Sequence, residues 1–176
     1  MKKQDILENQ VNLAYLSLGS NLGDKKNNLN KSIDLIQKEE ILVKKKSKFY
    51  STKSWPNENY PEFLNSIILI ETKLNLTELF LKIKKIEKKL GRTKSKRNHP
   101  RVCDIDIIDY NGEIKHIKLG NHKLNTPHKR MHNRNFVLFP LYELDKNWVH
   151  PKLNTNIVIL MSNLTSEQLL GIKIAQ

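Results

Sequence analysis

The sequence predicts an α+β fold of the ferredoxin-like, split β-α-β type. We expect a mainly antiparallel sheet with an added hairpin strand and C-terminal helices. The first six segments with regular hydrophobic patterns follow the order β-α-β-β-α-β. A chain of 176 residues suits one domain with a sizeable core. Because no linker, repeat or low-complexity segment marks a second domain, we expect an N-terminal extension, residues 1–11, and a single domain over residues 12–176.

The first half of the predicted fold contains two strands and a helix. Residues 13–18 form a short apolar strand that runs into a glycine-containing turn. Asp24 is placed to cap a helix whose apolar residues recur at helical spacing. These residues are Leu29, Ile33 and Ile36. Residues 41–51 form a strand with a basic middle, which suits a sheet edge, and the two prolines of residues 52–61 indicate a loop.

A second strand–helix–strand unit follows. Residues 63–72 are rich in isoleucine and predict a strand. Thr77 is the expected cap of the next helix, and Gly91 is its expected end. The apolar face of this helix consists of Leu79, Ile83, Ile86 and Leu90. A basic loop, residues 92–101, leads into a strand over residues 102–108, which two right-handed crossovers place beside the first strand at the centre of the sheet.

The remaining segments add a hairpin and helices. An Asn-Gly pair at residues 111–112 is typical of a type I′ turn, so it predicts a hairpin into residues 113–119. Residues 119–128 are expected to form a loop. Residues 131–144 show a helical apolar pattern, although it contains a proline. From about Ile157 we expect a short helix and a tail.

Composition limits the class of protein. The mean hydropathy is −0.57, and no apolar run approaches the 18 or so residues of a membrane span. The N-terminus lacks the apolar segment of a signal peptide. The single cysteine, Cys103, cannot form an internal disulfide, which favours a reducing, cytoplasmic compartment. We therefore expect a cytoplasmic monomer that binds small molecules, with no membrane and no nucleic-acid partner.

The distribution of positive charge favours an anionic ligand. The net charge is +13, which would also suit a nucleic-acid-binding protein. However, only five of the 31 basic residues are arginine, and the lysines are scattered over helical faces and loops. The arginines all fall between positions 92 and 134: Arg92, Arg97, Arg101, Arg130 and Arg134. Because arginine binds phosphate with two parallel hydrogen bonds, this concentration favours a small-molecule polyphosphate over a nucleic-acid backbone.

Two carboxylates interrupt the strand that follows the basic loop. Asp104 and Asp106 are two residues apart, so in a strand they share one face, with Cα atoms about 6.5–7 Å apart. Carboxylates this close repel each other unless a cation lies between them. Oxygen ligands without sulfur favour Mg²⁺, and two such ions can clamp a phosphoryl transfer. The alternative is a sheet edge whose polar face meets solvent. His128 and His132 have the spacing of a helical zinc pair, but no third ligand stands at the spacing of a zinc motif.

Other residues suggest a site for a flat ligand. Phe63 and Phe136 are two aromatic residues that can stack a planar heterocycle, while the amide of Asn65 reads its edge. Each of them also suits an ordinary position in the core. Asn21, in the turn after the first strand, can present a second amide to a ligand.

The order of these motifs resembles one family. The carrying stretches are YLSLGSNLGDKKNNL, FYST, FLNSI, IEKKLGR, RNHPRVCDIDII and TPHKRMHNRNFVLFPLYEL. They resemble 6-hydroxymethyl-7,8-dihydropterin pyrophosphokinase, an enzyme family of folate biosynthesis, over roughly residues 12–150. The resemblance implies a ferredoxin-like fold with pyrophosphokinase activity. ATP would give its β,γ-pyrophosphoryl group to the pterin's hydroxymethyl oxygen, with AMP as the other product.

The resemblance also implies roles for individual residues. Asp104 and Asp106 would hold two Mg²⁺ ions. The triphosphate would be engaged by Arg92, Arg97, Arg101, His128 and Arg134, with Arg92 and Arg101 as the catalytic arginines and Arg101 acting on transition-state charge. Glu87 and Lys123 would lie on the ATP side. The pterin would be hydrogen-bonded by Thr52 and Asn65 and stacked between Phe63 and Phe136.

The sequence departs from the family pattern at three positions. Asn98 and His99 stand where the family usually has an aromatic residue and then glycine or alanine, in a loop that closes over the pterin. Lys129 stands where a tyrosine is common. We expect these changes to affect lid closure and affinity while the reaction is retained. Two alternatives remain: a nucleic-acid-binding module on a ferredoxin-like sheet, and an enzyme-like domain without activity.

Overall fold

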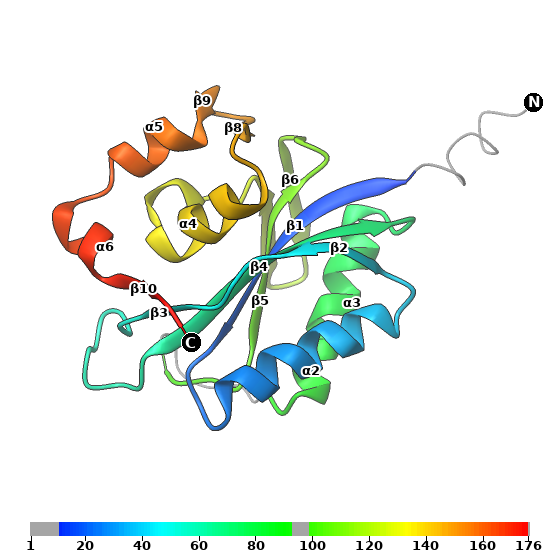
Figure 1. Cartoon of the computed structure of the whole chain (residues 1–176). Coiled ribbons are helices and arrows are strands. Elements are labelled where there is room, and N and C mark those ends of the chain that lie inside the picture. The colour runs from blue at the N-terminus through cyan, green and yellow to red at the C-terminus, as the bar shows by residue number, and fades with distance from the viewer. Residues whose placement is uncertain (1–10, 93–98, 176) are drawn as a thin grey trace, which may run out of the picture.

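A six-stranded antiparallel sheet forms the middle layer of the molecule (Figure 1). The computed structural model describes residues 11–92 and 99–175, so most of the predicted N-terminal extension lies outside the described residues. The strand order is β10-β3-β4-β1-β5, and β2 also pairs with β4. The strands are β1 (Asn12–Ser20), β2 (Leu42–Lys46), β3 (Tyr50–Thr52), β4 (Phe63–Thr72), β5 (Asp104–Tyr110) and β10 (Ile172–Ile174). This confirms the predicted α+β class with a mainly antiparallel sheet.

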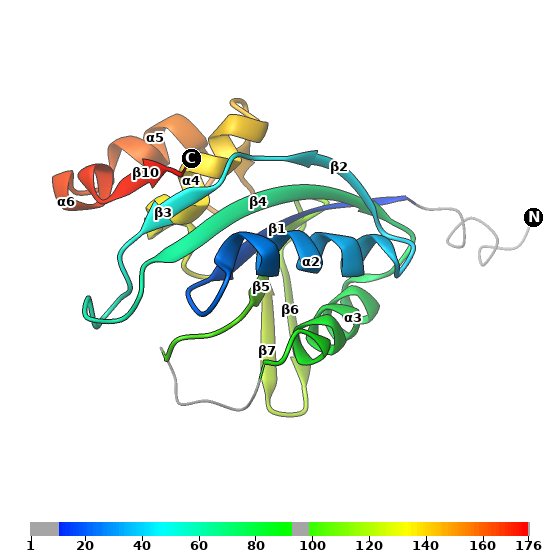
Figure 2. The same cartoon turned by 60° about the horizontal axis from the view of Figure 1, so that its bottom comes forward.

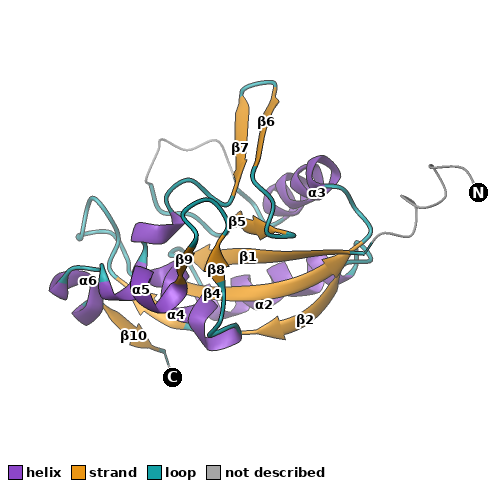
Figure 3. Cartoon of the chain, turned by 90° about the horizontal axis from the view of Figure 1, so that it is seen from above, coloured by secondary structure: helices purple, strands orange, loops and turns teal. Residues whose placement is uncertain are grey.

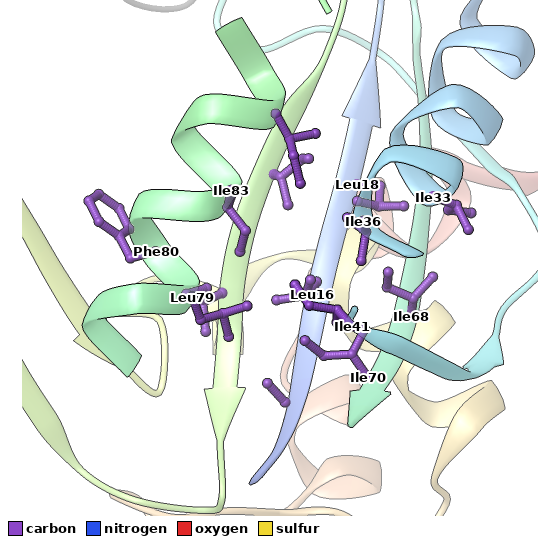
Figure 4. Packing of buried hydrophobic residues seen from close by; sticks show 14 of the residues in the cluster. Leu16, Leu18, Ile33, Ile36, Ile41, Ile68, Ile70, Leu79, Phe80 and Ile83 are labelled. Atoms are coloured by element: carbon purple, nitrogen blue, oxygen red, sulfur yellow. The ribbon is translucent and has the colours of Figure 1, made fainter. Parts of the chain in front are cut away.

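Helices α2 (Lys25–Gln37) and α3 (Leu76–Lys89) cover one face of the sheet (Figure 2). The Asp24 carboxylate accepts a hydrogen bond from the Asn27 backbone, as the sequence predicts. The predicted Thr77 cap of α3 is wrong, because Asn75 caps this helix and forms a capping box with Glu78. Figure 4 shows the core between these helices and the strands. It includes Leu16, Leu18, Ile33, Ile36, Ile68, Ile70, Leu79 and Ile83.

A second apolar cluster lies on the other face of the sheet. Ile67 and Ile108 belong to this cluster, whereas their neighbours Ile68 and Ile107 belong to the first, as strand alternation requires. The covering elements are a 3-10 turn η1 (Met131–Asn133), α4 (Asn135–Leu144), β8 (Val149–His150), β9 (Thr155–Asn156), α5 (Ile157–Ser162) and α6 (Ser166–Leu170). Pro140 lies inside α4 without ending it. Within the described ranges, no helix is both long and apolar enough to cross a membrane.

The hairpin was predicted with the wrong partner. The turn at Asn111 and Gly112 has positive φ angles at both residues (54° and 65°), which fits type I′. However, β6 (Lys115–Leu119) pairs with β7 (His122–Thr126) and not with β5. The predicted loop over residues 119–128 was therefore wrong. Figure 3 shows the β6–β7 hairpin extending away from the main sheet.

Three strand predictions also need correction. β5 does lie beside β1, but at the end of the strand order and not at the centre of the sheet, and it begins at Asp104 and not at residue 102. The single strand predicted over residues 41–51 is two strands, both paired with β4. The predicted C-terminal tail contains β10, which pairs with β3.

Candidate active site

The register of the sheet sets the position of the two aspartates. Asp104 lies opposite Gly19 of β1, and Gly19 lies opposite Asn65 of β4. Opposite residues of an antiparallel pair project from the same face. Two residues along, Asp106 is in line with Ser17 and Ile67, and Ile67 packs into the cluster on the α4 side. Both aspartates therefore project from the face that α2 and α3 leave free.

Asp104 is bound by two arginines. Arg92 Nη1 lies 2.7 Å from Asp104 Oδ1, and Arg101 Nη1 lies 3.0 Å from Oδ2, so each oxygen has its own cation. Burial lowers the pKa of Arg92, but Asp104 and Glu87 outweigh this effect, and the net shift is upward. The two guanidinium groups offset the repulsion between Asp104 and Asp106 in the absence of a ligand.

Glu87 lies beneath this cluster, and only 2% of the residue is exposed. Its carboxylate accepts hydrogen bonds from the Ile105 backbone (2.8 Å), from Lys84 Nζ (2.8 Å) and from Arg92. Burial raises the pKa of the Glu87 carboxyl, against the opposing effect of Lys84 and Arg92. Glu87 therefore connects α3, the start of β5 and the arginine that binds Asp104.

Asp106 is the more open of the two carboxylates, with 37% of its side chain exposed. Its Oδ2 lies 3.7 Å from Arg134 Nη1 and 3.9 Å from His128 Nε2, which is beyond hydrogen-bonding distance. Burial lowers the pKa of both His128 and Arg134, and the charge of Asp106 opposes the shift. The arrangement leaves room at Asp106 for a further cation or for an anion beside the two basic groups.

A pocket of about 200 Å³ opens between α3, β5 and β7. Its polar lining comprises Lys84, Asp106, His122, Lys123, Asn125, His128 and Lys129. The structure thus brings Lys123 and His128 together with Asp106, as the site prediction requires. Lys84 and Lys129 were not predicted as site residues. Lys84 had one available signal, because it precedes Glu87 by three residues on the same helix. Three lysines facing one carboxylate make this pocket suitable for an anion.

Asn21 joins three segments around the site. Its Oδ1 accepts a hydrogen bond from the Arg101 backbone (2.7 Å), and its Nδ2 donates to Ser54 Oγ (3.2 Å) and to the Pro61 carbonyl (3.3 Å). The residue is 1% exposed. Both ends of the amide are thus bound to protein groups, and Asn21 connects the turn after β1 to the loop before β5 and to the loop between β3 and β4.

Thr52 and Asn65 lie together on neighbouring strands. Asn65 Nδ2 donates to Thr52 Oγ1 over 3.0 Å, and both residues are buried. A Cβ atom on Gly19 would lie 3.3 Å from Asn65 Oδ1 and 3.7 Å from the Phe63 ring. Glycine therefore leaves open space in front of Asn65 and Phe63 that a side chain would fill.

Of the other residues that the sequence singled out, the structure describes some and not others. Phe136 lies in the first turn of α4, and the Arg134 guanidinium carbon is 5.3 Å from the centre of its ring. His99 packs against Tyr60, with ring centroids 5.6 Å apart. Arg97 and Asn98 lie outside the described residues. The described residues contain no group of three or more His, Cys, Asp or Glu side chains placed to hold a metal ion by themselves.

The family model of 7,8-dihydro-6-hydroxymethylpterin-pyrophosphokinase matches residues 15–146. A 2-amino-4-hydroxy-6-hydroxymethyldihydropteridine pyrophosphokinase of Aquifex aeolicus is 40% identical over 138 residues, which cover 78% of this chain and 83% of that protein. The enzyme of the same name from Bacillus subtilis is 40% identical over 134 residues, covering 76% of this chain and 78% of that protein. The folic acid synthesis protein FOL1 of Dictyostelium discoideum is 38% identical over 153 residues, covering 87% of this chain but 22% of that protein.

Solved structures share the fold. The crystal structure of Plasmodium falciparum HPPK-DHPS wild type with STZ-DHP matches with a TM-score of 0.71 at 18% identity, over 89% of this chain and 42% of that chain. The A437G/K540E form with pterin and p-hydroxybenzoate matches with a TM-score of 0.74 at 16% identity, over 97% of this chain and 49% of that chain. This chain spans less than half the length of these solved chains.

Proposed function

Because this chain belongs to the 7,8-dihydro-6-hydroxymethylpterin-pyrophosphokinase family, whose members are diphosphotransferases of folate synthesis, we propose that it transfers the pyrophosphoryl group of ATP to this pterin. The hydroxymethyl oxygen forms a bond to the β-phosphorus and loses its proton. The bond between the β-phosphorus and the oxygen bridging it to the α-phosphorus breaks, and AMP leaves with that oxygen. The observation that carries the proposal is the pair Asp104 and Asp106 on one face of the sheet, surrounded by basic side chains.

The carboxylate pair fits Mg²⁺ as part of a shell that other oxygens complete. Two carboxylates provide too few oxygens for its six-coordinate shell, and the described residues add no third acidic, histidine or cysteine ligand. Water and phosphate oxygens of ATP would complete the shell, which is the usual arrangement for this ion. We propose that Asp104 and Asp106 hold two Mg²⁺ ions. When bound, these ions would neutralise charge on the transferred phosphates and polarise the attacking hydroxyl.

The arginines exchange partners when ATP binds. In the structure described here, Arg92 and Arg101 bind the oxygens of Asp104. The triphosphate would offer Arg92 and Arg101 new acceptors, and Asp104 would then be free to hold a cation. Arg92 and Arg101 then bind phosphate oxygens and stabilise the charge that develops during transfer. Arg97 is assigned to the triphosphate by family resemblance alone.

The pocket between α3, β5 and β7, called the basic pocket from here on, receives the rest of the nucleotide. Asp106, Lys123 and His128 all line it, so a triphosphate that reaches Asp106 extends into this pocket. Lys84 and Lys129 add positive charge to the same wall. Glu87 serves the ATP side by holding Lys84 and Arg92 and not by contacting the nucleotide, because its carboxylate is buried and bound to protein donors.

The pterin occupies the space in front of Gly19. Asn65 and Thr52 provide the hydrogen-bonding groups there, and Phe63 and Phe136 provide faces on which the ring stacks. A well-placed aromatic pair contributes about 0.5–1.5 kcal/mol beyond the area that it buries. Asn21 holds the two neighbouring loops in place.

Replacing Gly19 with alanine should raise KM for the pterin about tenfold or more and leave KM for ATP within about twofold. The new Cβ would press on Asn65 Oδ1 at 3.3 Å and occupy space beside Phe63. Steady-state kinetics with each substrate varied separately measure this effect. In an Asn65→Ala background, Gly19→Ala should raise the KM for the pterin much less, because the Asn65 side chain that the new Cβ presses on is gone. An equal increase in both KM values would contradict this placement of the pterin.

The products of the reaction test the proposed function. Incubation of the protein with ATP, Mg²⁺ and the reduced pterin should release AMP and the pterin diphosphate in equal amounts. Release of ADP would show transfer of one phosphoryl group and overturn the proposal. No turnover at all, in protein that is folded by circular dichroism, would favour a domain without activity.

A further inference from the structure

Arg134 occupies an unusual backbone position between two helical segments. It is the C-cap of η1 and at the same time the N-cap of α4, with extended angles (φ −122°, ψ 109°). The Arg134 side chain does not cap α4, whereas Asn135 Oδ1 accepts from the Phe136 backbone N–H (2.7 Å) in the first turn. The Arg134 backbone N–H donates to the Met131 carbonyl (3.1 Å), and its carbonyl accepts from Val137 (3.1 Å) and Leu138 (2.9 Å), so contacts at its two chain neighbours add to bonds that already fix this residue. The Arg134 side chain ends 3.7 Å from Asp106.

Gln168 of α6 binds both neighbours of Arg134. Its side-chain Nε2 donates to the Asn133 backbone carbonyl over 2.9 Å, and its backbone carbonyl accepts from Asn135 Nδ2 over 2.6 Å. Figure 1 shows α6 beside α4, close to the C-terminal end of the chain. These two contacts join segments that are 35 and 33 residues apart in the sequence. One contact holds the Asn133 backbone and the other holds the Asn135 side chain, on either side of a single extended residue.

A second hydrogen bond of the Gln168 side chain, to the start of α6, holds that side chain in place. Thr165 caps α6, and the Thr165 backbone donates to Gln168 Oε1 over 3.0 Å, which completes a capping box. With Oε1 held in this way, Nε2 is directed at the Asn133 carbonyl. Because little side-chain freedom remains, this contact costs little further entropy. Residue 168 lies beyond the segment that matches the family model, residues 15–146.

We propose that Gln168 is a positioning residue for Arg134: it holds the Asn133 backbone carbonyl and the Asn135 side chain and thereby keeps the Arg134 guanidinium beside Asp106, where it binds the triphosphate. This inference rests on the proposed role of Arg134 at the triphosphate. It gives the C-terminal helix α6 a function in nucleotide binding, although no residue of α6 lines the basic pocket.

The variant Gln168→Glu tests the inference because it replaces the donor nitrogen with an oxygen while adding one negative charge. Glutamate keeps the oxygen that accepts from Thr165 and suits a capping box, but it cannot donate to the Asn133 carbonyl. We expect the Kd for ATP with Mg²⁺, measured by calorimetry without pterin, to rise about three- to tenfold, the effect of one hydrogen bond. Gln168→Ala, which also removes the cap acceptor, should weaken ATP binding at least as much and lower the melting temperature as well. Glu167→Gln, an exposed change on the same helix, should leave the Kd unchanged.

A double-mutant cycle with Arg134→Ala separates positioning from a general structural effect. If Gln168 acts through Arg134, then Gln168→Glu should weaken ATP binding in the native protein but not further in the Arg134→Ala protein. Independent, additive effects would overturn the inference while leaving the role of Arg134 intact. An unchanged Kd in Gln168→Glu, with a raised Kd in Arg134→Ala, would do the same. An unchanged Kd in Arg134→Ala itself would overturn both the inference and the proposed role of Arg134.

Discussion

Replacement of Asp106 with asparagine should lower kcat by about two to three orders of magnitude, the usual effect of removing one group that stabilises developing charge. The change keeps the shape of the side chain and removes its negative charge. Without that charge Asp106 would hold the proposed cation less tightly, and Arg134 and His128 would lose the negative charge that they face at 3.7 and 3.9 Å. AMP release at saturating substrates measures the effect.

The control for this variant is Asp34→Asn, which makes the same change in charge on the exposed surface of α2. It should retain full activity. The Asp106 side chain is 37% exposed, so Asp106→Asn should also keep the melting temperature of the native protein within about 2 °C. A kcat within tenfold of the native value would contradict the assignment of Asp106 to the reaction.

Replacement of Glu87 with alanine should lower the free energy of unfolding by about 3 kcal/mol or more. The change leaves the Ile105 N–H without its acceptor, and it leaves Lys84 and Arg92 without a buried counter-charge. Unpaired charges and donors at a buried position cost more than the lost contacts themselves. Urea unfolding at pH 7 measures the difference.

A matched control is Glu58→Ala, which breaks an exposed ion pair with Lys53. Exposed pairs contribute about 1 kcal/mol or less, so this variant should be close to the native protein. The free energy of unfolding of Glu87→Gln should fall between those of Glu87→Ala and Glu58→Ala, since glutamine keeps an oxygen for the Ile105 N–H. Equal stability of Glu87→Ala and Glu58→Ala would show that Glu87 does not hold α3 to β5.

Much of the fold follows from local patterns in the sequence. The helical spacing of apolar residues after Asp24 predicted α2 and its cap, and the isoleucines of residues 63–72 predicted β4 at its observed bounds. The two-residue period of a strand placed Asp104 and Asp106 on one face, and the register confirms it. These features depend on residues close in sequence, so one sequence is enough to find them.

Features set by distant contacts could not be predicted in this way. The Asn-Gly turn at residues 111–112 has the predicted conformation, yet β5 pairs with β1, and β6 pairs with the strand that follows it. Turn chemistry fixes the bend but not which strands pair across the sheet. The Asn75 cap was missed because Thr77 is also a good capping residue, and only Asn75 has Glu78 three residues later.

The sequence predicted several side chains that the structure brings together at the site, but not how they are connected. The clustering of arginine between positions 92 and 134 indicated a polyphosphate site, and the structure places Arg92, Arg101 and Arg134 around the two aspartates. The sequence did not indicate that Asp104 binds two arginines. It also gave no sign of the contacts of Gln168, which join residues more than 30 positions apart.

The most direct test is a crystal structure with Mg²⁺, the reduced pterin and an ATP analogue whose α,β-bridging oxygen is replaced by a methylene group. The bond between this oxygen and the β-phosphorus is the one that breaks in the proposed reaction, so the analogue should hold the complex before transfer. We expect two cations bound by Asp104 and Asp106, with Arg92 and Arg101 moved from Asp104 onto phosphate oxygens. Cations held by phosphate and water alone, with Asp104 still bound to both arginines, would contradict the account.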